Sequence, residues 1–177
     1  MNSNNHTPVI IQTLEELVAA LSEGESTTYN HIIHLIELSA DIFDDYTSWS
    51  KESYTRNCII NNEKFELILL CWEQGQITPI HDHGGEECWV KVINGEFREK
   101  IYKENDIGEL NVTKTTISRV NEVTYMKDFM GFHSLENISN KRSMSLHLYA
   151  KPIRKCRTFD EENKKFINRR LTYCTTV

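Results

Sequence analysis

Residues 88–102, with the sequence CWVKVINGEFREKIY, limit the fold more than any other stretch of the chain. Apolar and polar side chains alternate on both sides of Asn94-Gly95, which is typical of strands with one buried face. Because Asn-Gly favours a type I′ turn, the stretch predicts a β-hairpin that turns at Asn94-Gly95. The middle of the chain is therefore expected to form antiparallel sheet.

Other short strand-like runs, separated by polar turns, follow from about Tyr54 onwards. Residues 65–73, FELILLCWE, predict a buried strand because they are rich in branched apolar side chains. Further strand-like pieces are residues 111–112, 118–120, 123–126 and 143–150. No long helical pattern interrupts them, so we expect a mainly β fold, an antiparallel barrel or jelly roll.

Two helices are predicted ahead of the strands. Thr13 and Glu16 fit a capping box, apolar residues follow at helical spacing, and Gly24 is a plausible end. A second helix is predicted near residues 28–40. We therefore expect one domain over 1–177, with N-terminal helices over about 1–48 and a barrel with its tail over about 49–177.

Charge and cysteine content narrow the class of protein. The formal net charge of −6 disfavours nucleic acid as a partner, because phosphate binding needs a basic surface. No apolar run approaches the roughly 18 residues of a membrane helix, and the start, MNSNNHTPV, lacks the layout of a secretion signal. The five cysteines form no CxxC pair, which disfavours a structural zinc site. An odd number of cysteines without a secretion signal indicates a reducing compartment and free thiols, so we expect a cytoplasmic protein. No exposed apolar stripe is evident, and a monomer is expected.

His81 and His83 are the first candidates for metal binding. In a strand, residues two apart point to the same face, so the two imidazoles can converge on one ion. By contrast, His31 and His34 on the predicted second helix lack a third histidine or acidic partner, and we interpret them as surface or packing residues.

The glycines around the pair resemble the first motif of the cupin barrels. Gly75 precedes His81 by six residues, and Gly95 follows His83 by twelve. The motif normally places a glutamate ligand at the position of Cys88, and Glu87 is one residue short of it. In the same barrels a later histidine completes the site, which matches His133 in MGFHSLEN; the alternative is a histidine in a turn at a strand start.

The strand-like segment 143–150 divides into two faces. Met144, Leu146 and Leu148 share one face, and Ser145, His147 and Tyr149 share the other. The polar face either points to solvent or forms a hydrogen-bonded series inside a polar barrel, and the pattern alone leaves both possibilities open.

Five motifs in order resemble the cysteine dioxygenase family, and together they extend from about Tyr54 to Phe159. They are YTRN at 54–57, CW at 71–72, IHDH at 80–83 with Cys88, GFHS at 131–134 and SLHLY at 145–149. The resemblance implies a cupin barrel in which His81, His83 and His133 hold Fe²⁺. It further implies oxidation of L-cysteine by O₂ to cysteine sulfinic acid, an early step of cysteine catabolism towards taurine, pyruvate and sulfate.

The resemblance also assigns roles to the residues around the metal. Arg56 would bind the substrate carboxylate, and Tyr54 and the Tyr149 hydroxyl would face the same group. His147 would orient Tyr149 through a hydrogen bond. The supporting residues behind His147 would be Ser145 and Trp72.

Cys88 and Tyr149 match a cysteine and a tyrosine that form a thioether cross-link in many family members. The alternative for Cys88 is a small buried apolar residue.

Cys156 is interpreted as a pocket-rim or packing residue, and the segment after Phe159 matches the family poorly. A non-catalytic cupin, or an enzyme for 3-mercaptopropionate or cysteamine, remains an alternative function.

Overall fold

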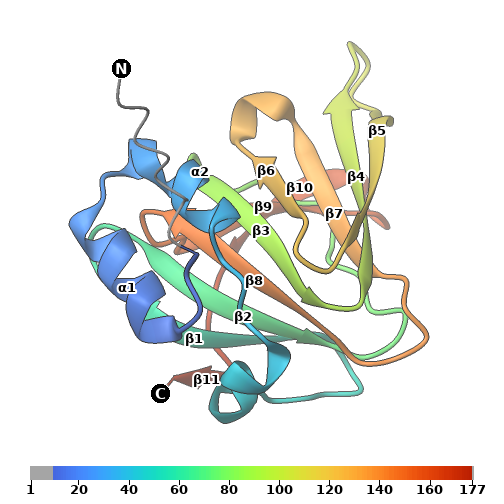
Figure 1. Ribbon diagram of the computed structural model, residues 1–177. Coiled ribbons are helices and arrows are strands. Elements are labelled where there is room, and N and C mark those ends of the chain that lie inside the picture. The colour runs from blue at the N-terminus through green and yellow to red at the C-terminus, as the bar shows by residue number, and fades with distance from the viewer. Residues whose placement is uncertain (1–9, 177) are drawn as a thin grey trace, which may run out of the picture.

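A computed structural model describes residues 10–176 of the chain (Figure 1), so the N-terminal stretch interpreted as lacking a secretion signal lies largely outside the described residues. The helices in this range are α1 (Leu14–Glu23), α2 (Ser26–His34) and the 3₁₀ helices η1 (Ala40–Tyr46) and η2 (Asp128–Met130). The strands in this range are β1 (Thr55–Asn61), β2 (Glu66–Trp72), β3 (Glu87–Asn94), β4 (Glu96–Glu104), β5 (Leu110–Arg119), β6 (Val123–Met126), β7 (Phe132–Asn137), β8 (Ser143–Ala150), β9 (Lys155–Asp160), β10 (Lys165–Arg170) and β11 (Thr175–Thr176).

The strands form a jelly roll of one large and two small sheets. Hydrogen bonding gives the order β11-β1-β2-β8-β3-β6 in the large sheet, with β5-β4-β7 and β10-β9 as the small ones. All strand pairs are antiparallel except β1 with β11. The helices α1 and α2 cover one face of the large sheet, and the small sheets lie on its other side (Figure 1). The predicted mainly β cupin jelly roll with N-terminal helices is confirmed, although the sheets do not close into a continuous barrel.

The alternation of side chains along β2 and β8 divides the core in two. On β8, Leu146 and Leu148 pack with the N-terminal helices, whereas Tyr149 packs between the sheets. On β2, Leu69 and Ile68 make the same division. Both strands are buried along their whole length, as a central strand with covered faces must be.

The first helix is confirmed in detail, but the second ends earlier than predicted. In α1, Thr13 and Glu16 form the capping box, and Gly24 caps the end. After α2, the chain becomes extended because Ile11 donates its N–H to Leu35 and accepts one from Glu37, both at 2.9 Å. Within residues 10–176, no helix has the length and apolar character needed to cross a membrane.

The predicted hairpin at Asn94-Gly95 is wrong. The strand β3 pairs with β6 and β8, whereas β4 pairs with β5 and β7, so Asn94-Gly95 is a corner at which the chain passes between sheets. Gly95 has φ +95°, and a Cβ at this position would overlap the Ser143 hydroxyl. Glycine at this position therefore allows the chain to pass close to Ser143, and it does not form a two-residue hairpin turn.

The strand β5 was predicted only as two fragments, at residues 111–112 and 118–120. It is one strand of ten residues, and it ends at Arg119, before Val120. Most of its side chains are exposed on both faces, so the alternation that marks a half-buried strand is missing.

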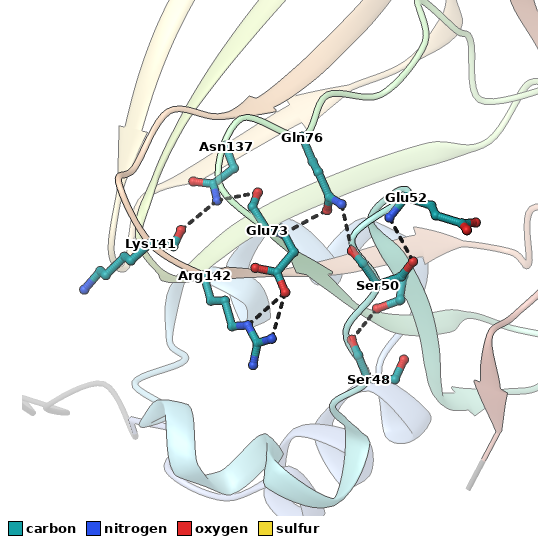
Figure 2. A network of polar contacts seen from close by, with 9 residues as sticks. Ser48, Ser50, Glu52, Glu73, Gln76, Asn137, Lys141 and Arg142 are labelled. Carbon is teal, nitrogen blue, oxygen red and sulfur yellow. Dashed lines mark hydrogen bonds and ion pairs between the residues drawn. The ribbon is translucent and has the colours of Figure 1, made fainter.

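A polar network fixes the segment that leads from β2 to the predicted metal histidines (Figure 2). Gln76 Oε1 accepts from the Glu73 N–H, and its Nε2 donates to Ser50 O, both at 2.9 Å. Arg142 Nε donates to the Glu73 carboxylate at 2.9 Å, and Asn137 Nδ2 donates to Glu73 O at 3.1 Å. Side chains from three separate segments therefore hold this connection, which is otherwise irregular.

The corner at Gly95 gives a stability prediction. In Gly95→Ala, the new Cβ meets Ser143 at a positive φ, and we expect the free energy of unfolding to fall by about 2 kcal/mol or more. Gly85→Ala is the matched control, since Gly85 has φ +100° but no atom near the position of a Cβ. Urea denaturation should show the larger loss for Gly95→Ala, and equal losses would contradict the steric explanation.

Candidate active site

The backbone brings His81 and His133 together. His81 donates its N–H to His133 O at 3.0 Å, and His133 donates its own to His81 O at 2.9 Å. Opposite residues of such a pair place their side chains on the same face, and the two rings lie with centroids 4.5 Å apart. His81 also bridges to Thr158 of β9, so this single residue connects the two small sheets.

His83 joins the pair from a loop and not from a strand. Its N–H donates to the Asp128 carboxylate at 3.0 Å, and its ring lies 4.7 Å from that of His133. The ligand atoms of the three histidines lie within 4.8 Å of one another. The structure thus gathers the three predicted metal residues, although the regular strand assumed for His81 and His83 is reduced to isolated bridges at His81.

The hydrogen bonds of the rings leave nitrogen lone pairs directed at one point. His81 Nδ1 lies 2.9 Å from Pro79 O, and His133 Nδ1 lies 2.7 Å from Glu99 Oε1, so both Nδ1 atoms donate and both Nε2 atoms carry a lone pair. His133 Nε2 is 3.0 Å from His83 Nε2. A shared divalent cation suits such an arrangement of imidazole nitrogens.

Burial keeps the imidazoles of His81 and His83 neutral. It lowers the pKa of His81 to about 3 and the pKa of His83 well below its usual value, and the nearby His133 adds to both effects. Neutral imidazole is the form that coordinates metals. The donor set therefore fits a transition metal such as iron, copper, nickel or zinc, and the ligand type alone does not choose among them.

Glu99 is a site residue that the sequence analysis missed. It is buried on β4 with Phe97 and Ile101 on the same strand face, and its carboxylate accepts from His133. A carboxylate behind a metal-binding histidine fixes the ring and raises its basicity. The available signal was a charged residue at an inward position of an otherwise apolar strand face.

Glu87 lies outside the histidine cluster. Its Oε1 accepts from the Tyr125 hydroxyl at 2.8 Å and from Lys127 Nζ at 2.9 Å. The histidines predicted to be surface or packing residues, His31 and His34, are both exposed on α2.

Cys88 and Tyr149 face each other beside the histidine cluster. They are directly opposite in the β3–β8 pair, and both are buried. The Tyr149 ring lies 5.5 Å from that of His83. Burial raises the pKa of Tyr149 well above its usual value and also raises that of Cys88, so both groups are protonated at neutral pH.

The polar face of β8 points inward. Trp72 Nε1 donates to Ser145 Oγ at 3.0 Å, and Ser145 Oγ lies 2.8 Å from His147 Nε2. The rings of His147 and Tyr149 are 6.4 Å apart, and His147 Nδ1 is buried without a partner among the described residues. The alternative of a solvent-facing strand is wrong, while the expected bond from His147 to the Tyr149 hydroxyl is not formed in this structure.

A cavity of about 470 Å³ opens next to His81 and Tyr149. Arg56 and Tyr54 line it, and Tyr54 stacks on Trp72 with centroids 4.6 Å apart. Nε and Nη2 of Arg56 are buried and have no hydrogen-bond partner in the described part of the chain. Burial opposes the charge of the guanidinium, but nearby groups, chiefly Tyr149, outweigh it and raise the pKa of Arg56. A charged guanidinium with free N–H groups in a cavity fits an anionic ligand.

Comparison with known proteins identifies relatives of the chain. The family model "Cysteine dioxygenase type I" matches residues 3–162 of the chain. "Cysteine dioxygenase type 1" of Danio rerio is 32% identical over 161 residues, which are 85% of this chain and 80% of that protein. The protein of the same name from Homo sapiens is 35% identical over 120 residues, 66% of this chain and 60% of that protein.

A solved structure supports the fold alone. Oxalate decarboxylase of Lactobacillus farciminis, in its formate complex, aligns with a TM-score of 0.53 and 14% identity, over 66% of this chain and 34% of that chain.

The contact from Glu99 to His133 predicts a dependence of metal affinity on that carboxylate. We expect Glu99→Gln to weaken the binding of a divalent metal roughly 10- to 100-fold, because His133 becomes less basic and less firmly oriented. Competition with a chelator measures the affinity, and Glu87→Gln is the matched control because its partners are Tyr125 and Lys127. Similar affinities for the two variants would show that Glu99 does not support the site.

Proposed function

The chain belongs to the cysteine dioxygenase type I family, and from this membership we propose that it oxidises L-cysteine with O₂ to cysteine sulfinic acid. In this proposal His81, His83 and His133 hold Fe²⁺, and the cavity beside them receives the substrate. One observation carries the assignment: the same cavity contains a histidine of the cluster and the buried N–H groups of Arg56, which have no partner among residues 10–176.

A histidine of the cluster and a guanidinium on the wall of one cavity suit an amino-acid thiol. The sulfur and amine of cysteine are directed to the metal side, and its carboxylate to Arg56. The planar guanidinium offers two parallel N–H groups, and each charged hydrogen bond contributes about 1.5–3 kcal/mol. Tyr54 and the Tyr149 hydroxyl face the same end of the substrate in this proposal.

Bound Fe²⁺ would supply the positive charge that favours the thiolate form of the substrate and the redox chemistry with O₂. Three neutral imidazoles leave the charge of the ion uncompensated, and Glu99 stays behind His133, so an anionic sulfur is attracted strongly. The protein itself contributes orientation and a dry cavity. Both oxygen atoms end on sulfur, and the thiol supplies four electrons, so no external reductant is needed.

Behind Tyr149, the buried series of Trp72, Ser145 and His147 keeps the wall of the cavity rigid. Reorientation of His147 would let Nδ1, which has no partner in the described residues, reach the tyrosine hydroxyl once substrate is bound. This reorientation is part of the proposal.

The proposal extends to the setting of the reaction. We place the protein in the cytoplasm as a monomeric domain, acting on free cysteine and O₂ and feeding cysteine catabolism towards taurine. Nucleic acid is not a partner in this proposal, in line with the net charge of −6.

Oxygen consumption tests the function directly. Protein loaded with iron under anaerobic conditions should consume one O₂ per cysteine and release an equal amount of sulfinate. Parallel assays with 3-mercaptopropionate and cysteamine decide between the proposed substrate and the alternatives. Iron binding without oxygen uptake for any of the three thiols would favour a non-catalytic cupin.

Arg56 should discriminate between thiols. We expect Arg56→Gln to reduce kcat/KM for L-cysteine roughly 10- to 100-fold, because one or more charged hydrogen bonds are lost. The loss for 3-mercaptopropionate should be much smaller, because the family resemblance extends to relatives that prefer this thiol and carry glutamine at the position that matches Arg56. Steady-state kinetics with both thiols measure the ratio, and equal losses would count against the assigned role.

The opposition of Cys88 and Tyr149 supports a thioether bond between them. After aerobic turnover, denaturing gels should show two bands, and mass spectrometry should find the cross-linked species lighter by two hydrogens. Cys88→Ala should remove the second band, and Cys71→Ala, which changes another buried cysteine, should keep it. A doublet that persists in Cys88→Ala would disprove the assignment.

A further inference from the structure

The outer wall of the cavity comes from a segment beyond the part that matches the family model. The match ends at residue 162, whereas residues 169–172 and Cys174 line the cavity opposite His81 and Tyr149. Residues 169 and 170 belong to β10 and pair with β9, but the backbone of residues 171–176 is held at few points. Leu171 donates its N–H to Arg154 O at 3.0 Å, and β11 pairs with β1 over two residues only.

This wall lies directly on the residue that faces the substrate carboxylate. Cys174 donates its N–H to Arg56 O at 2.7 Å, and the Arg56 N–H points to Cys174 Sγ at 3.4 Å. Without these contacts β1 would be an edge strand at Arg56, because β2 covers only its other side. The position of Arg56 is therefore coupled to the seating of residues 171–176.

One side chain, Tyr173, fixes the segment to the core. Its hydroxyl donates to the carboxylate of Glu66, and it also accepts from Arg154 Nη1 at 3.2 Å and from Asn61 Nδ2. Glu66 is completely buried at the start of β2 and lies 3.5 Å from Arg154. A buried carboxylate destabilises the fold unless hydrogen-bond partners satisfy it. The bond from Tyr173 to Glu66 is therefore strongly favoured over a state in which Glu66 stays buried without it. We call Tyr173, Glu66, Asn61 and Arg154 the Tyr173 anchor.

We propose that Tyr173 is a positioning residue for substrate binding: by bonding to Glu66 it seats residues 171–176 on β1, and so fixes Arg56 at the carboxylate end of the cavity. This inference rests on the proposed function for its kinetic part only. A two-residue strand with one parallel neighbour has little stability of its own, so release of the Tyr173 anchor would let it open locally. Arg56 would then lose its fixed distance from the histidine cluster.

Hydrogen exchange tests the seating without iron or turnover. In Tyr173→Phe, which removes only the hydroxyl, amides of residues 55–58 and 171–176 should exchange at least five-fold faster than in the wild type. The matched control is Tyr102→Phe, because the Tyr102 hydroxyl bonds to Ser134 on another sheet. Glu66→Gln keeps an acceptor for the tyrosine and should largely preserve the slow exchange. Unchanged exchange in Tyr173→Phe would overturn the anchor.

Kinetics then test the positioning role. For the iron-loaded protein, Tyr173→Phe should raise KM for L-cysteine about 5- to 20-fold with kcat within about three-fold, because a contact common to the bound and transition states is weakened. Binding of cysteamine, which has no carboxylate, should be unchanged. Faster exchange with an unaltered KM, or equal weakening for both thiols, would overturn the positioning role. A wild-type protein that does not oxidise cysteine would refute the proposed function, while the exchange result would still decide the anchor.

Discussion

The mutual backbone pair between His81 and His133 is the constraint on which the rest of the site depends. It places His81, from a connecting segment, beside His133 of β7. His81 also forms a bridge to Thr158 of β9. The side chain of Gln76, bonded to the Glu73 N–H and to Ser50 O, holds the segment that leads to His81. Because the backbone hydrogen bonds already place the two rings side by side, no attraction between the histidine side chains is needed to form the cluster.

Charge explains how the parts of the site work together. Burial lowers the pKa of His81 and His83 and favours their neutral form, and the Glu99 carboxylate is bonded to His133 Nδ1. An ion at this centre would keep its full charge towards the cavity. Arg56, whose Nε and Nη2 are buried, adds a cationic group at the wall of this cavity, which Arg169 and Arg170 also line. A zwitterionic thiol whose sulfur and carboxylate both carry negative charge is complementary to this pair, which is why the family function and the geometry agree.

The sequence predicted correctly those features that depend on interactions within one helix or one strand. The capping box at Thr13 and the two faces of β8 follow from hydrogen bonding and side-chain alternation within one element. The corner at Gly95 was mistaken for a hairpin because an Asn-Gly pair carries no information about which strands will pair. Glu99 was missed for a related reason, since its partner His133 is brought to it only by the pairing of β4 with β7. The role of Tyr173 likewise depends on Glu66, 107 residues away in sequence.

The central claim is that three imidazoles hold one iron ion without an acidic ligand. Anomalous diffraction at the iron edge from crystals of the iron-loaded protein tests it most directly. The account predicts a single peak within bonding distance of a nitrogen atom of His81, His83 and His133, with Glu99 bonded to His133 and not to the ion. A peak elsewhere, or a carboxylate oxygen of Glu99 or Glu87 coordinated to the ion, would contradict it.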